Sequence, residues 1–197
     1  MAVDFAFMAA GAPETTRQRI LDAAVEMTTE TGWASVTMSR IAQRCGVSRQ
    51  TVYNDIGAKP ALAKSLILRE LEQFLAVVST AFDQEDDFIR AIRQATYGVL
   101  DRAQDNKLLH AVVSATHGAD TELLPYLTSH SEGLLGYATE LIHEHVEKFE
   151  HGLTDDQADT AIEMTVRVVL SHVMQPTRSP DETADDIAWL ISRVLNG

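Results

Sequence analysis

The 197-residue chain contains a single cysteine, Cys45, which excludes an intrachain disulfide. A lone thiol suits a reducing compartment, so we expect a cytoplasmic protein. No apolar run approaches the length of a transmembrane helix, and we expect no membrane partner. The apolar residues 1–13 include Asp4 and lack a basic flank. They make a poor secretory signal and favour a flexible tail, in which Met8 is an alternative start.

The motifs of common enzymes are missing too. The sequence has neither a Gly-x-Ser-x-Gly nucleophile motif nor a glycine-rich phosphate-binding loop. His143, Glu147 and His151 follow one another at helical spacing, but no fourth metal ligand accompanies them, and a solvated helix end is the simpler interpretation. We therefore predict no cofactor, no metal and no enzymatic activity. An all-α enzyme is the rival hypothesis from another functional class.

The sequence also lacks a sustained alternation of apolar and polar residues, which is the pattern of half-buried strands. Apolar residues instead recur at helical spacing, and capping residues, glycines and prolines separate the segments. These signals predict an all-α fold of about nine helices. Two short helices are expected within residues 37–60, and the others at about 14–31, from Pro60 to a break at 84–87, 88–103, 108–117, 121–151, 154–174 and 179–195.

Basic charge is scarce, since the formal net charge is −13 at pH 7, and this argues against contact with phosphates. The distribution of the charge answers that objection. Residues 1–60 contain six basic and six acidic side chains, so the whole excess of acid lies in residues 61–197. Residues 37–60 contain four basic groups and one acid. A nearly neutral N-terminal part with a locally basic face is compatible with DNA binding.

The segment with this local basic charge, residues 37–60, reads TMSRIAQRCGVSRQTVYNDIGAKP. Ala42, Gly46 and Val52 have the spacing of a helix-turn-helix: the alanine lets two helices approach, the glycine permits a tight turn, and the valine is buried. The second helix would then expose side chains that can bind bases and phosphates. These are Ser48, Arg49, Gln50, Thr51, Tyr53 and Asn54.

Residues from about 15 to 66 resemble the N-terminal signature of the TetR family of transcriptional repressors. The resemblance rests on RQRILDAAVEM near the start, Gly32 followed by an aromatic residue, T-x-x-x-IA at 37–42, GVS, TVY and Gly-x-Lys at 57–59. Two positions depart from the pattern. The family usually has an aromatic residue where Ile56 stands, and often a serine where Ala58 stands. The second departure removes a helix cap, at a cost of about 1 kcal/mol at most.

The resemblance implies a homodimer that places two recognition helices in successive major grooves of a palindromic operator, about 34–36 Å apart. By the same resemblance, Thr37, Tyr53 and Lys59 bind phosphates. The residues expected to contact base edges are Arg49, Gln50 and Thr51, since arginine suits guanine and glutamine suits adenine. Asn54 is expected near the rim, and Ser48 is a further DNA-binding residue. No basic arm precedes the first helix, and we expect no reading of the minor groove.

The resemblance also implies a DNA-binding domain at residues 14–59 and a helical effector-binding and dimerisation domain at 60–197. A largely apolar interior with few polar anchors suits a small hydrophobic, fatty-acid-like effector. The SHVMQP segment near residue 174 is similar to that of members tied to lipid or alkane metabolism. The candidate polar anchors are Tyr97, His110, His117, Tyr137 and Arg167.

The last two expected helices carry apolar stripes that could form a four-helix interface between two subunits. The residues predicted to form it are Val166, Val169, Val173, Ile187, Leu190, Ile191 and Val194. The sequence thus predicts a DNA-binding transcriptional regulator, a repressor that its effector releases from the operator. An activator and an architectural DNA-binding protein without an effector are the alternatives.

Overall fold

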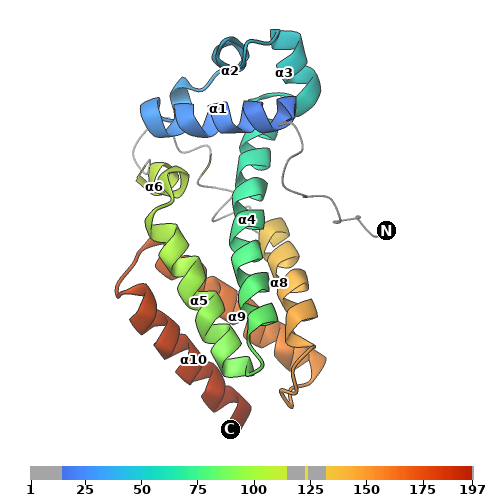
Figure 1. Ribbon diagram of the computed structural model, residues 1–197, viewed down its shortest axis with the longest axis vertical. Coiled ribbons are helices and arrows are strands. Elements are labelled where there is room, and N and C mark those ends of the chain that lie inside the picture. Colours follow the sequence, from blue (N-terminus) through green and yellow to red (C-terminus); the bar gives the residue numbers. More distant parts are fainter. Residues whose placement is uncertain (1–14, 115–122, 124–131, 197) are drawn as a thin grey trace.

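The computed structural model of the chain describes residues 15–114, 123 and 132–196. Every regular element in these ranges is helical, and the nine α-helices there confirm the expected all-α fold (Figure 1). None of the described helices is both long and apolar enough to cross a bilayer. The elements are α1 (Thr16–Thr31), a 3-10 turn (Trp33–Ser35), α2 (Met38–Cys45), α3 (Arg49–Ile56), α4 (Lys59–Gln84), α5 (Phe88–Gln104), α6 (Lys107–Ser114), α8 (Glu132–Val146), α9 (Asp155–Met174) and α10 (Pro180–Asn196).

Helices begin at the capping signals of the sequence. Thr154 accepts a hydrogen bond from the Gln157 backbone N–H, and the Gln157 side chain accepts one from the Thr154 N–H, which confirms the capping box expected before α9. Asp87 caps α5, as the acidic break before it indicates. A further capping box, absent from the expectations above, is formed at the start of α1 by Thr15 and Gln18.

One helix differs in length from the expectations. The C-terminal end predicted for the helix at 121–151 is wrong, because α8 ends at Val146. The backbone N–H of Phe149 donates to the Val146 carbonyl at 3.0 Å, and the Phe149 ring lies 5.4 Å from that of Phe88. Burial of this ring therefore competes with continuation of the helix. The expected start of that helix, and residues 115–117 of the helix expected at 108–117, lie outside the described residues.

Helices α1 to α3, which we call the head, surround a small hydrophobic core. Ile20, Ala24 and Met27 share the buried face of α1, as the helical spacing predicts. Trp33 of the 3-10 turn is buried in the same core. The head does not complete this core by itself, because helices outside it contribute Leu62, Ala63 and Leu66 from α4 and Leu108 and Val112 from α6.

The remaining helices, α4 to α10, form what we call the body. The long helix α4 runs from the head into the body, where α5 and α8 pack against it, α9 packs on α5 and α8, and α10 packs on α5 (Figure 1). Gly98 permits the close approach of α5 to α4, because a Cβ atom at this position would lie 2.6 Å from Val77 Cγ1. Val78 and Phe82 of α4 belong to the second hydrophobic cluster, so this helix takes part in both cores.

Candidate nucleic-acid interface and ligand cavity

The turn between α2 and α3 has the geometry that the sequence predicts. Gly46 ends α2 in the left-handed conformation, with φ 66° and ψ 31°, which residues with a side chain adopt less readily. The Val47 N–H donates to the Ala42 carbonyl at 3.0 Å, and Ala42 and Val52 are both buried in the head core. Helices α2 and α3 are thus fixed as a helix-turn-helix that leaves one face of α3 exposed.

Thr37 and Ser48, two of the expected DNA contacts, are the N-caps of α2 and α3. Thr37 Oγ1 accepts the Arg40 N–H at 3.3 Å, and Ser48 Oγ accepts the Thr51 N–H at 3.0 Å. Ser48 Oγ also lies 2.9 Å from Thr51 Oγ1. A capping hydroxyl uses a lone pair and keeps its hydrogen. The two roles are therefore compatible, and a hydroxyl that starts a helix is in place to donate to a phosphate oxygen.

Polar side chains occupy the exposed face of α3. Arg49 and Gln50 take the first two helical positions, where the backbone N–H groups favour anions, and both are exposed. Gln50 Nε2 donates to Asn54 Oδ1 at 2.8 Å, so these two amides lie side by side on the surface. Tyr53 is 41% exposed. This face brings together a guanidinium, two amides and a phenol, which are groups that bind phosphates and base edges.

The basic charge of the head is smaller than the local sequence indicates. Arg44 donates to both carboxylate oxygens of Glu30 at 2.9 Å, and its Nη2 lies 3.0 Å from a Glu26 carboxylate oxygen. The hydrogen bond from Arg44 holds the pKa of Glu30 below its usual range, and the same bond raises the pKa of Arg44. Both groups therefore stay charged and paired. Fewer cations than the four of residues 37–60 are left to attract phosphates.

Lys59, at the start of α4, is turned toward the head. Its ammonium donates to the Trp33 carbonyl at 3.1 Å and lies 4.9 Å from the centroid of the Trp33 ring. An ammonium over the face of an aromatic ring is held there by the negative charge of that face. A phosphate contact by Lys59 would use the remaining N–H donors of the same ammonium. As expected from Ala58, α4 begins without a side-chain cap.

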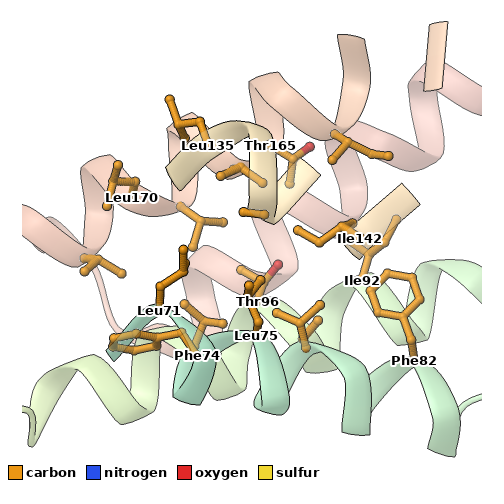
Figure 2. Close-up of a pocket in the computed structure, with 18 of the residues that line it drawn as sticks. Leu71, Phe74, Leu75, Phe82, Ile92, Thr96, Leu135, Ile142, Thr165 and Leu170 are labelled. Carbon is orange, nitrogen blue, oxygen red and sulfur yellow. The ribbon is translucent and has the colours of Figure 1, made fainter. Parts of the chain in front are cut away.

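A partly open cavity of about 240 Å³ lies among the helices of the body (Figure 2). Helices α4, α5, α6, α8, α9 and α10 all contribute to its wall, and most of the lining side chains are aliphatic or aromatic. An apolar cavity of about 150 Å³ already suffices to bind benzene in another protein. The body cavity is therefore large enough for an apolar small molecule. Its described lining includes only four polar side chains, Glu70, Thr96, Asn106 and Thr165.

Two protein-family models match the chain. The model described as "Bacterial regulatory proteins, tetR family" matches residues 20–66, and that described as "Bacterial Tetracyclin repressor, C-terminal domain" matches residues 87–193, more than half of the chain. The chain belongs to the TetR family. It is a transcriptional regulator with a helix-turn-helix DNA-binding region, and members of this family are not enzymes.

Curated relatives and solved structures agree with this assignment. The regulator AlkX of Mycobacterium tuberculosis is 26% identical over 177 residues, which cover 89% of this chain and 83% of the relative. UidR of Escherichia coli K12 is 40% identical over 63 residues, 32% of each chain. The crystal structure of the TetR family repressor AlkX from a Dietzia strain has a TM-score of 0.74 at 24% identity and covers 94% of this chain and 98% of that one. FadR of Bacillus halodurans has a TM-score of 0.58 at 22% identity, covering 95% and 98%.

Four of the five polar residues predicted as effector anchors are described by the structure, and none of these four is part of the described cavity wall. Tyr97 and Tyr137 are half-buried, and burial raises the pKa of Tyr137, but neither is among the described residues of the cavity wall. His110 and Arg167 are exposed, the first bonded to a backbone carbonyl and the second to a carboxylate of its own helix. His117 lies outside the described residues.

None of the four polar residues of the described cavity wall is among the anchors predicted from the sequence. Thr96 follows Ala95 on the apolar stripe of α5, and Thr165 precedes Val166 on that of α9. A threonine on an apolar stripe is the signal that could have identified them, because a polar side chain at a core position needs a partner. Glu70 and Asn106 lie on α4 and just before α6, and nothing in their local sequence distinguishes them from surface residues.

Five of the seven residues predicted to form a dimer interface line the cavity. These are Val166, Val169 and Val173 on α9 and Ile191 and Val194 on α10. On α10, Ile187 and Ile191 are buried. Leu190 and Val194 of the same helix are each 50% exposed. Further large apolar side chains are exposed on these two helices, namely Met164 and Val168 of α9 and Trp189 of α10.

The histidines considered as metal ligands are not gathered at one point. His143 lies 2.7 Å from Asp159 and 3.3 Å from Glu147, whereas His151 follows the end of α8 and accepts the Leu153 N–H. Across the described part of the chain, no group of three or more metal-ligating side chains could hold an ion.

Removal of the two carboxylates that pair with Arg44 should strengthen binding to DNA of any sequence. In the double variant Glu26→Gln/Glu30→Gln, Arg44 is free to reach a phosphate. The plot of log affinity against log salt on a scrambled duplex should steepen by up to about 0.9, the value of one phosphate contact. The control Glu144→Gln/Glu150→Gln makes the same change in net charge on the body. An equal effect of both variants would show that total charge, rather than release of Arg44, is responsible.

Proposed function

We propose that this regulator is a homodimeric, cytoplasmic repressor that binds a palindromic operator and leaves it when a small apolar effector enters the body cavity. In this proposal residues 14–59 read DNA, and residues 60–197 bind the effector and dimerise. The observation that carries the proposal is the joint packing of a helix-turn-helix and an apolar cavity on the same helices, α4 and α6.

The DNA contacts are assigned by the chemistry of the exposed face. Arg49 and Gln50 at the start of α3 are the base-reading pair, because a guanidinium suits guanine and an amide suits adenine. Thr37, Tyr53 and Lys59 contact phosphates and set the register of the head on the duplex. Ser48, Thr51 and Asn54 complete the contact surface.

The dimer interface is assigned to the exposed apolar face of α9 and α10. A monomer rarely leaves so many large apolar side chains exposed together, and burial of this face by a second copy would remove them from water. A helix-turn-helix unit normally reads half-sites in pairs. The face consists of Met164, Val168, Trp189, Leu190 and Val194.

The route from cavity to head is assigned to α6 and α4. Leu108 and Val112 belong to the head core and also line the cavity, so a ligand that displaces α6 must disturb the packing of the head. Asp22 of α1 accepts a hydrogen bond from Arg69 Nη1 at 2.7 Å, which ties the head to α4 by charge as well.

The apolar character of the cavity supports a hydrophobic, lipid-like effector. Two relatives fit this class by their descriptions: the Dietzia repressor AlkX is implicated in biodegradation of n-alkanes, and FadR of Bacillus halodurans is a fatty acid degradation regulator. The cavity also argues against the alternative of an architectural DNA-binding protein, because a protein that binds no effector does not require a ligand-sized cavity. An activator would use the same surfaces.

Because Arg49 is assigned to base edges and Lys59 to phosphates, Arg49→Ala and Lys59→Ala should affect DNA binding differently. Arg49→Ala should weaken binding to the operator by roughly tenfold to a hundredfold, because one bidentate base contact contributes about 1–3 kcal/mol, and should leave a scrambled duplex nearly unaffected. Lys59→Ala should weaken binding to both duplexes. Fluorescence anisotropy on the two duplexes measures this. Equal losses on both for Arg49→Ala would refute its role in base reading.

The proposed dimer face predicts that two charges placed on it will separate the subunits. The double variant Val168→Glu/Trp189→Glu should sediment as a monomer with an unchanged helical circular dichroism spectrum. Its operator affinity should fall at least about a hundredfold, because the second head no longer binds at a high effective concentration. Thr80→Glu/Gln94→Glu, at exposed positions of α4 and α5, is the matched control. A dimer that survives the first pair of changes would place the interface elsewhere.

A further inference from the structure

The body cavity has a specific electrostatic character in addition to its apolar one. The described residues of its wall include one ionisable side chain, the carboxylate of Glu70, and no lysine, arginine or histidine. The segments outside the described residues, 1–14, 115–122, 124–131 and 197, contain no lysine or arginine, and His117 and His130 are their only basic side chains. Those segments therefore offer a buried anion neither a guanidinium nor an ammonium, and an ordinary histidine side chain is neutral at pH 8.

Glu70 is already engaged with a neighbour at the wall. Asn106 Nδ2 donates to Glu70 Oε2 at 2.7 Å, and Asn106 Oδ1 accepts the Leu109 N–H at 2.8 Å. This arrangement uses the amide of Asn106 on both sides and leaves the negative charge of Glu70 without a cation among these contacts. A ligand carboxylate in the cavity would meet a like charge there.

Thr96 offers a different kind of contact. It is 5% exposed, and its hydroxyl makes no hydrogen bond with any described residue. Figure 2 shows Thr96 among the apolar side chains of the cavity, together with Thr165. The Thr165 hydroxyl, by contrast, donates to the Ala161 carbonyl of its own helix at 2.7 Å. A ligand hydroxyl that reaches Thr96 adds a hydrogen bond that the described residues do not already provide.

The shape of the cavity favours a chain over a compact ring system. Its wall includes Ile67 near the head and Phe82 near the far end of α4. These positions are fifteen residues apart in one helix, which corresponds to about 22 Å at 1.5 Å per residue. Thr96 lies in the middle of α5.

We infer that the cavity selects an uncharged long-chain aliphatic molecule with one hydroxyl group, of the fatty-alcohol class, and discriminates against the ionised carboxylate of the same chain length. The alcohol hydroxyl pairs with Thr96. An ionised carboxylate loses its hydration and meets Glu70 but no lysine or arginine. This inference rests on the proposed function of the cavity as the effector site and narrows the fatty-acid-like class to its neutral members.

The test compares decan-1-ol with decanoate at pH 8, where the acid is ionised, in direct binding to the full-length protein by isothermal titration calorimetry without DNA. Decan-1-ol should bind at least about a hundredfold more tightly than decanoate. This comparison in the wild-type protein needs no variant. Decanoate binding as tightly as the alcohol would overturn the inference and leave the proposed regulator function intact. Binding of neither probe would overturn the inference together with the proposal that the cavity takes an aliphatic effector.

Two variants locate the selectivity. Thr96→Val, which keeps the shape of the side chain, should weaken decan-1-ol binding by about fivefold to tenfold, as expected for one lost hydrogen bond. Thr80→Val is its control, since that hydroxyl bonds its own helix and Thr80 is absent from the described cavity wall. Glu70→Gln should raise decanoate affinity about tenfold without affecting the alcohol, and Glu72→Gln, an exposed neighbour, should do neither. Equal behaviour of variants and controls would overturn the assignment.

Discussion

The architecture depends on one constraint, that a single helix belongs to two hydrophobic cores. The head-proximal turns of α4 bury Leu62 and Leu66 among the helices of the head, and later turns bury Val78 and Phe82 in the body. Because protein interiors are close-packed, neither core can rearrange without moving this helix. The helix-turn-helix and the body cavity are thereby coupled through the packing of α4, and α6 reinforces the coupling through Leu108 and Val112.

The charge distribution of the chain fits a DNA-binding protein whose affinity comes more from base-specific contacts than from general attraction to phosphates. A net charge of −13 opposes nonspecific contact with DNA, and the pairing of Arg44 with Glu26 and Glu30 removes one more cation from the head. The exposed Arg49 and the amide of Gln50 remain at the start of α3. A protein of this kind should bind weakly to arbitrary sequences and gain its affinity from base contacts and from pairing of two heads.

The turn and the core of the head could be predicted from sequence, and the cavity could not, for a physical reason. The turn at Gly46 and the burial of Val52 follow from local spacing and backbone freedom. A cavity is instead a space left between helices far apart in the chain, so no local pattern marks its wall. Tyr97 and Arg167 were predicted as anchors because they are large polar residues among apolar ones. The described wall instead contains Thr96, whose small side chain does not interrupt the apolar pattern of the sequence.

The central claim, that occupation of the cavity sets the spacing of the two heads, can be measured directly by double electron–electron resonance. A nitroxide on Asn54→Cys, in a background with Cys45→Ala, gives one distance between the two subunits. Without ligand the distribution should include separations of about 35 Å, which match successive major grooves. Saturation with an apolar ligand of confirmed binding should shift it away from that value by several ångströms. An unchanged distribution in the saturated dimer would contradict the account.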